Sequence, residues 1–304
     1  SVLVLVNHYS LRAAFLLQLF LGHTREFRID RWYFTAKKKI SDKVGLTMTT
    51  DMRATTDGGR LDIFMKNAYI DVKNFIGGAT LVAGQQGTPW IGNEEKAWKY
   101  RVLRMTIADE RGLLTSADFG LGLKGEFNNK NGDYHLLFSN GEGYGKREEG
   151  LNSEAVKNAN GKDLTGRVSF RPGDNAPRLS LYGDIGSAGG ADSNRRGVLI
   201  DQQIGLFSYG ASYLWAKDNT TKKNAFSIYG NYDFNQSPWS LYARYDSYDP
   251  DKSVDSNKKT AVIAGAAYKF DKNMMLTLSG HIDKDQVPGV EKDTTLKAAL
   301  EVNY

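Results

Sequence analysis

The feature that most constrains this chain is an alternation of apolar and polar residues with a period of two. In one segment, Leu179, Leu181 and Ile185 fall on one face of an extended chain, whereas Arg178 and Asp184 fall on the other. An α-helix would place its apolar residues three or four positions apart, so the pattern predicts β-strands with one apolar face.

The alternation recurs from one end of the chain to the other and predicts sixteen strands. The expected strands are residues 1–9, 27–40, 43–52, 64–75, 78–86, 116–127, 132–140, 163–172, 177–186, 196–208, 209–218, 223–234, 237–248, 259–270, 273–283 and 296–304. Most of these segments have the 9–11 residues that a tilted strand needs to cross a bilayer.

The composition excludes several other classes of protein. The mean hydropathy of −0.47 and the lack of an apolar run of about 18 residues exclude a bundle of membrane-spanning helices. Because no Cys is present, a disulfide scaffold, a thiolate zinc site and a cysteine nucleophile are also excluded. A chain that is polar on average, with 12% aromatic residues and 32 Gly, fits a transmembrane antiparallel β-barrel.

The predicted connections support the barrel because short turns alternate with longer loops along the chain. Seven connections are short, and the eight between them are longer, as in barrels with short turns on one side of the membrane. Apolar-phase aromatic residues, including Phe127, Phe234 and Trp239, end strands beside the short turns, where an aromatic girdle is expected. Residues 1–26 are atypical: we expect a first strand at 1–9 and a loop over the apolar stretch that follows.

Short motifs give the chain a resemblance to bacterial outer-membrane porins, and most closely to the phosphate-selective porin O/P-like group. Residues 27–52 resemble that group's second and third strands, and residues 67–92 resemble its "aYvd" strand and "GQ…P[FW]G" strand end. The chain also ends on an aromatic residue, Tyr304, as outer-membrane proteins commonly do.

The resemblance implies one transmembrane barrel domain over residues 1–304, in the outer membrane of a Gram-negative cell. Its expected function is a water-filled channel for the passive diffusion of small hydrophilic or anionic solutes and ions. The expected partners are outer-membrane lipid, lipopolysaccharide and two further copies in a homotrimer. No cofactor is expected, and a signal peptide is expected to have been removed.

The longest predicted connection, residues 87–115, is the third long loop, which in general porins folds into the barrel. We interpret it as a constriction loop whose opposed charges filter solutes. The candidate constriction residues are Glu94, Glu95, Lys96, Lys99, Arg101, Arg104 and Arg111. The alternative is that these charges form a solvated outer surface.

The strand pattern also predicts which charged residues line the lumen. The basic candidates are Lys124, Arg167, Arg171, Arg178, Arg244 and Lys269. Acidic residues in the same phase are nearly as numerous, which predicts at most a weak anion preference. The cluster of Arg167, Arg171 and Arg178 is expected either to form a basic patch near the short turns or to pair with neighbouring acids.

Other functions find little support in the sequence. The net charge of +5 is too small to favour nucleic-acid binding, and the four His residues show no metal-ligand spacing. Ser279 and His281 share the lumen phase, but we expect no catalytic residues and no enzyme. Two alternatives remain open: a structural or interaction barrel, such as an adhesin or a sheath around a partner protein, and a soluble β-sandwich.

Overall fold

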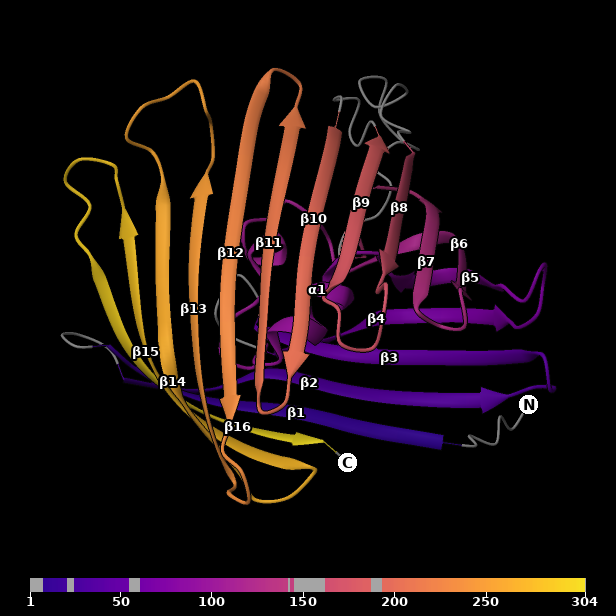
Figure 1. Cartoon of the computed structure of the whole chain (residues 1–304), viewed down its shortest axis with the longest axis horizontal. Helices are drawn as coiled ribbons and strands as arrows, with labels where there is room; N and C mark the ends of the chain where they lie inside the picture. The colour runs from indigo at the N-terminus through magenta and orange to yellow at the C-terminus, as the bar shows by residue number, and fades with distance from the viewer. Residues whose placement is uncertain are drawn as a thin grey trace.

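The computed structural model describes residues 8–20, 25–54, 61–141, 143–144, 162–186 and 193–303. Sixteen antiparallel strands form a closed barrel in which each strand pairs with its neighbours in sequence and β1 pairs with β16 (Figure 1). Closure gives every strand a hydrogen-bonded neighbour on both sides, as a strand structure in lipid requires. The predicted all-β transmembrane barrel of sixteen strands is therefore confirmed.

The elements follow the predicted order. The strands are β1 His8–Phe20, β2 Arg25–Lys39, β3 Val44–Ala54, β4 Leu61–Val72, β5 Thr80–Gly87, β6 Ala117–Phe127, β7 Gly132–Ser139, β8 Asp163–Phe170, β9 Arg178–Gly186, β10 Ser193–Ile204, β11 Phe207–Asp218, β12 Thr221–Asp233, β13 Trp239–Asp249, β14 Lys259–Lys269, β15 Met274–Asp285 and β16 Asp293–Asn303. Two helices, α1 Ile91–Trp98 and α2 Ile107–Glu110, lie between β5 and β6. No helix in the described ranges is long and apolar enough to cross a membrane.

Side-chain exposure follows the alternation along the strands. On β13, Leu241 and Tyr245 are 48% and 40% exposed on the outer face, whereas Tyr242 and Arg244 are 4% and 3% exposed on the inner face. The apolar phase of the sequence therefore faces outward, toward lipid, and the polar phase faces the interior.

The predicted loop at the start of the chain is wrong. The strand that closes the barrel is β1, at residues 8–20, and only 21–24 separate it from β2; the predicted loop at 10–26 is largely strand. In register, Leu16 lies opposite both Ala299 of β16 and Arg28 of β2, so β1 is paired on both sides. This pairing is non-local, and the local pattern of an apolar stretch cannot reveal it. Most of the predicted strand at 1–9 lies outside the described residues.

The strict alternation of short and long connections also fails at one hairpin. Only residues 219–220 join β11 to β12, where a longer loop was expected. Asn219 has a φ of 52°, in the left-handed region that Asn tolerates in tight turns. The two longest connections, 88–116 and 140–162, nevertheless lie on the same end of the barrel, which we call the long-loop end.

Exposed aromatic rings surround the opposite, short-turn end. Phe127 and Phe170 stack with ring centroids 6.3 Å apart, and Trp239 lies edge-on to Tyr268 at 5.0 Å. Phe270 is 52% exposed on the same end. These rings stand where the aromatic girdle was predicted; Tyr304 lies outside the described residues.

The outward phase can be tested by the placement of a charge. Leu181 is 46% exposed on the outer face of β9, so Leu181→Lys should destabilise the barrel in bilayers by about 2–4 kcal/mol. Glu126→Lys, on the inner face of β6 beside open space and opposite Asp133, should fold normally. Urea titration of folding into lipid vesicles measures both, and equal losses would contradict the register. Ser180 and Ala299 also face inward, but they are only 0% and 1% exposed. A lysine at either position would have no room, so neither residue can serve as the inner control.

Candidate functional site: a loop seated inside the barrel

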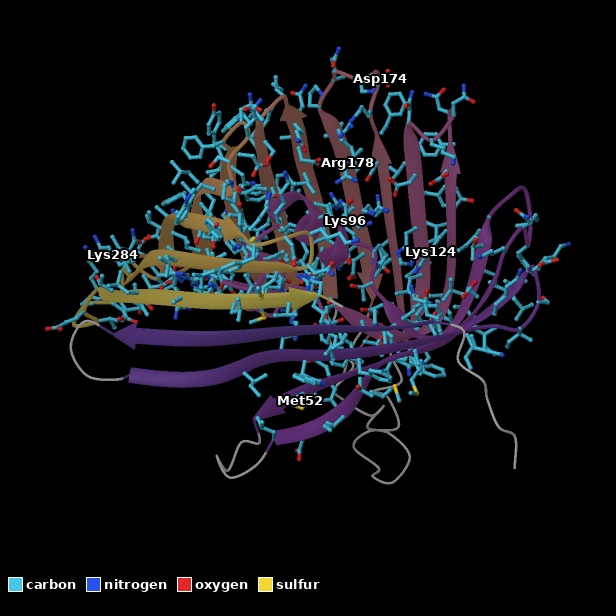
Figure 2. All side chains as sticks on the ribbon, turned by 90° about the horizontal axis from the view of Figure 1, so that it is seen from below. Met52, Lys96, Lys124, Asp174, Arg178 and Lys284 are labelled. Atoms are coloured by element: carbon cyan, nitrogen blue, oxygen red, sulfur yellow. The ribbon has the colours of Figure 1, made fainter. Side chains whose placement is uncertain are left out.

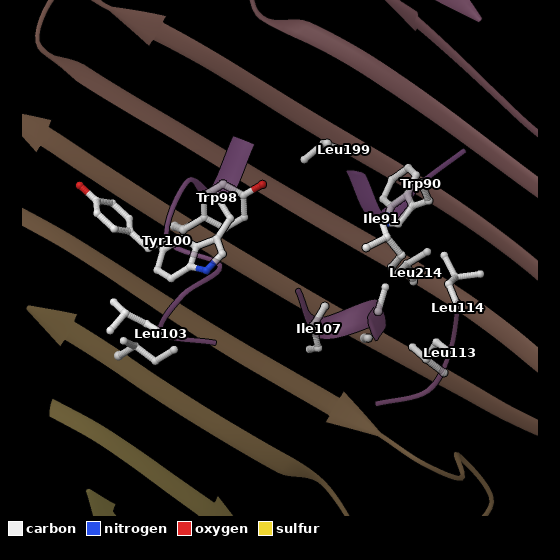
Figure 3. Close-up of a cluster of buried hydrophobic side chains, with 14 of the residues drawn as sticks. Trp90, Ile91, Trp98, Tyr100, Leu103, Ile107, Leu113, Leu114, Leu199 and Leu214 are labelled. Atoms are coloured by element: carbon white, nitrogen blue, oxygen red, sulfur yellow. The ribbon is translucent and has the colours of Figure 1, made fainter. Parts of the chain in front are cut away.

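Residues 88–116 run inside the ring of strands and pack on its inner wall. The loop contributes Trp90, Ile91, Trp98 and Ile107, which are at most 1% exposed, to an apolar cluster with inward side chains of β9–β14 (Figure 3). The wall side of this cluster is Tyr182, Leu199, Leu214, Ala216, Ala225, Tyr229, Tyr242, Tyr248, Ile263 and Ala267, with Ala299 of β16 beside them. An apolar patch on the inner wall would be costly in a wet lumen, and the loop covers it.

The indole of Trp98 is the centre of the contact. Its ring lies 5.5 Å from that of Tyr229 and 6.2 Å from that of Tyr242, and the guanidinium of Arg244 lies 5.0 Å above it. Tyr100 continues the stack, 4.2 Å from Tyr242. Aromatic and cation–π contacts of this kind add to the energy of burial, so this part of the loop is anchored.

The helix α1 is tied to the wall by polar contacts that point away from the pore. Ser212 donates a hydrogen bond of 2.6 Å to the carboxylate of Glu94, and Trp90 donates a second of 3.0 Å. Burial raises the pKa of the Glu94 carboxyl, whose residue is 1% exposed. The amide of Asn93 donates to Ser180 at 3.2 Å. The structure thus places Glu94 against the wall.

Three other candidate constriction residues also hold the loop in place. The ammonium of Lys99 donates to Ser208 at 2.9 Å. Arg104 is paired with Glu110 at 2.5 Å and with Asp283 of β15 at 2.7 Å. The guanidinium of Arg111 lies 5.7 Å from the centroid of the Tyr248 ring on β13. These contacts leave Arg104 little exposed to a passing solute.

Arg244, a predicted lumen-wall residue, lies beneath the loop. Its two guanidinium contacts to Asp246 are 2.8 and 2.7 Å, and it donates a third hydrogen bond of 2.9 Å to the carbonyl of Met105. Arg244 and Asp246 are 3% and 2% exposed. The pair therefore joins wall and loop.

A second group of charges faces the open interior. Arg101 lies between Glu95, at 2.6 Å, and Asp109, at 3.1 Å; these three residues are the loop charge cluster. Burial raises the pKa of the Asp109 carboxyl, while Arg101 beside it acts in the opposite direction. Glu95 and Arg101 are therefore predicted constriction residues that lie on the pore side of the loop, unlike Glu94, Lys99 and Arg104.

Strands β2–β4, across the barrel from the loop's seat, present a matching wall cluster. It consists of Arg31, Tyr33, Asp51 and Lys66. The guanidinium of Arg31 lies 4.7 Å above the Tyr33 ring, and Arg31 interacts electrostatically with both Glu95 and Asp109. Charges of opposite sign therefore face each other across the interior.

Sequence reasoning did not single out the wall cluster. The alternation predicts strands at 27–40 and 64–75, but the predicted lumen-wall residues come from other strands. For Arg31 and Tyr33 the alternation itself was a sufficient signal. For Lys66 it was misleading, because strict alternation with Ile70 and Ala68 places that side chain on the lipid face.

A cavity of about 910 Å³ lies on the short-turn side of the loop, where several predicted residues meet. Its charged lining residues are Lys96, Lys124, Glu126, Lys130, Asp133, Arg167 and Arg178. Lys96 of α1, Lys124 of β6 and Arg178 of β9 can be followed in Figure 2. Within the described ranges, neither Lys96 nor Lys124 has a carboxylate in ion-pair contact; Lys96 and Arg167 repel Lys124, and Asp71 attracts it from a greater distance. We call this cavity the basic vestibule.

The other basic wall residues are partly neutralised. Arg167 pairs with Asp133 and donates to the Pro89 carbonyl at 2.9 Å. Arg178 pairs with Asp201 at 2.9 Å, and Lys269 with Asp233 at 3.3 Å. Arg167 and Arg178 thus pair with acids and also line the vestibule. Arg171 lies outside it, in the turn after β8, where its backbone N–H donates to Asn131 at 2.8 Å.

The Ser279–His281 pair is formed on the inner face of β15. The Ser279 hydroxyl lies 2.8 Å from His281 Nε2, but the two residues are 6% and 1% exposed. His281 Nδ1 has no hydrogen-bond partner among the described residues, so no carboxylate orients the imidazole there. No group of three His, Asp or Glu side chains in the described ranges could hold a metal ion.

Comparisons with known proteins give a likeness in structure alone. No family model and no curated protein matches the sequence. A loop-deleted form of the Vibrio cholerae outer-membrane protein OmpT is 14% identical, with 98% of each chain covered and a TM-score of 0.68. The anion-selective porin of Comamonas acidovorans is 12% identical, covers 98% and 99%, and has a TM-score of 0.68. Salmonella typhi OmpF, in complex with daunomycin, is 11% identical, covers 98% and 97%, and has a TM-score of 0.67.

At these identities the likeness shows the fold, a bacterial outer-membrane β-barrel of the kind found in porins. It does not single out the phosphate-selective group that the motifs of residues 27–92 resemble.

Proposed function

We propose that the chain forms a water-filled outer-membrane channel for the passive diffusion of small hydrophilic solutes, with a weak preference for anions. The observation that carries the proposal is the loop at 88–116, which lies on the inner wall and leaves charged side chains facing the interior. A sixteen-stranded barrel is wide enough to hold an aqueous channel. The loop narrows this channel, and the basic vestibule supplies open space on its short-turn side.

Selectivity arises where the two charge clusters face each other. Arg31 and Lys66 on one side and Glu95 and Asp109 on the other set up a field across the path. Fields in narrow, water-filled pores discriminate among solutes by their charge and dipole. A path with both signs suits small polar molecules better than a channel reserved for one ion such as phosphate.

The anion preference comes from the basic vestibule. Its lining carries more basic than acidic groups, and Lys96 and Lys124 lack ion-pair partners within the described ranges. An anion that passes the loop enters this region of positive potential. The role of the predicted lumen residues Lys124, Arg167 and Arg178 is to maintain it.

The anion preference can be tested at the two lysines. Lys96→Gln together with Lys124→Gln should shift the reversal potential in a salt gradient toward cation selectivity. The shift should shrink with added salt, because the Debye length falls from about 10 Å at 0.1 M to about 3 Å at 1 M. Lys292→Gln, in an exposed connection outside the barrel interior, is the control. An unchanged reversal potential at low salt would refute the role of the vestibule.

We also propose that the barrel works without catalysis and as a homotrimer within outer-membrane lipid and lipopolysaccharide. The buried Ser279–His281 pair has neither an orienting carboxylate among the described residues nor access to a substrate. A sheath around a partner protein needs a wide, open lumen, and the seated loop takes up part of that space.

Swelling of liposomes that contain the purified protein tests diffusion through the channel. Sugars of increasing size should enter at falling rates, and no entry of the smallest sugar would refute the channel.

A further inference from the structure

We infer that Lys66 is a selectivity-determining residue of the channel, placed in the lumen by a β-bulge that Gln85 holds from the lipid side. This inference rests on the proposed channel function.

The bulge is visible in the register of β3 and β4. Thr49 lies opposite Asn67, but the next residue, Thr50, lies opposite Met65, so Lys66 is an extra residue without a partner on β3. A bulge of this kind shifts the side-chain phase of its strand by one residue.

Exposure along β4 confirms the change of phase. After the bulge, Ile70 is 43% exposed on the outer face; before it, Met65 and Ile63 are 38% and 69% exposed there. Outward residues are therefore even-numbered on one side of the bulge and odd-numbered on the other, and both Lys66 and Asn67 turn inward. Without the extra residue, a lysine in this phase would face lipid, where a buried ammonium is costly.

Inside the barrel, Lys66 joins the wall cluster. Its ammonium bonds the Tyr33 hydroxyl and lies 4.5 Å from the centroid of that ring and 5.8 Å from the ring of Tyr144. It interacts electrostatically with Glu95 and Arg101 of the loop charge cluster. Lys66 thus supplies one of the positive charges that face the loop.

Gln85 of β5 explains how the bulge is stabilised. Its neighbours in register, Ala68 and Phe119, are both exposed on the outer face, so a glutamine at this position faces lipid. Its amide nitrogen donates to the carbonyls of Met65, at 2.6 Å, and Lys66, at 3.0 Å. The described β4–β5 ladder ends at Ala68 and Gln85, so these two carbonyls would otherwise lie unpaired next to lipid, which is expensive.

The preceding glycine permits the close approach of the two strands. Gly84 has a φ of 123°, and a Cβ there would lie 2.4 Å from the carbonyl oxygen of Ala68. The Gly-Gln pair at 84–85, part of the sequence motif noted above, therefore acts as one unit: Gly84 gives room, and Gln85 binds the bulge.

Three variants separate the charge from its positioning. Lys66→Gln removes the charge and keeps the bulge. Deletion of Lys66 removes both the charge and the bulge, so that the parts of β4 before and after it alternate as one regular strand. Gln85→Leu removes only the side chain that holds the bulge. In planar bilayers under a salt gradient, the first two should shift the reversal potential toward cations by similar amounts. Gln85→Leu should shift it in the same direction but less.

The double variant Lys66→Gln/Gln85→Leu should match Lys66→Gln alone, because Gln85 acts through the lysine. Additive shifts in the double variant, or no shift in Lys66→Gln, would overturn the inference. Gln203→Leu, at a turn-proximal glutamine, is the control for the amide change and should leave the reversal potential unaltered.

If Gln85→Leu folds poorly, Lys66→Gln and the deletion of Lys66 still test the charge and its placement, and a reversal potential unchanged in either would overturn the inference. An inactive wild-type protein would instead refute the proposed channel.

Discussion

Replacing residues 91–111 with a short Gly-Ser linker should raise the single-channel conductance severalfold. The segment contains both helices and the loop charge cluster, and it covers the inner wall of β9–β14. Its removal would widen the narrowest part of the path and expose it to bulk-like water. Planar-bilayer recording of single channels measures the change.

The control for this replacement is a change in a loop outside the lumen. Shortening the exposed connection between β13 and β14, at residues 250–258, should leave the conductance unaltered. If the two replacements had the same small effect, the loop at 88–116 would lie outside the conducting path.

Trp98→Ala is a milder change to the same loop. It should loosen the loop and increase the noise of the single-channel current, because the Tyr229 and Tyr242 contacts are lost.

Arg244→Ala should cost about 3–5 kcal/mol of stability, since it leaves a buried carboxylate without its partner. Asp246 is 2% exposed and accepts two hydrogen bonds from Arg244, which also binds the carbonyl of Met105 in the loop. Urea unfolding in detergent micelles measures the loss. In a double-mutant cycle, Arg244→Ala/Asp246→Ala should recover part of it, because no charge then remains buried.

A loss below about 1 kcal/mol, typical of an exposed ion pair, would contradict the buried arrangement. Lys269→Ala, at the partly exposed pair with Asp233, should show such a small loss and serves as the comparison.

The barrel could be predicted because its main determinant is local. A residue such as Leu179 has a polar neighbour on each side, and this alternation persists through strand after strand. The first strand could not be predicted, because β1 is defined by its pairing with β16 at the other end of the chain.

The site could be predicted only in part. The length and charge of the loop pointed to the right segment, but sequence does not tell whether a charged residue faces water or anchors the chain. Lys99 and Arg104 are bound to the wall, whereas Lys96 lines the vestibule. Lys66 was missed because a single extra residue in β4 reverses the phase on which the prediction relied.

The most direct test of the central claim is planar-bilayer recording of the purified wild-type protein in a salt gradient. We expect stepwise insertions of equal conductance, a linear current–voltage relation at low voltage and a reversal potential displaced slightly toward that of the anion. Folded protein that inserts into the bilayer without conducting would contradict the account of an aqueous channel. A reversal potential displaced strongly toward the cation would contradict the assigned role of the basic vestibule.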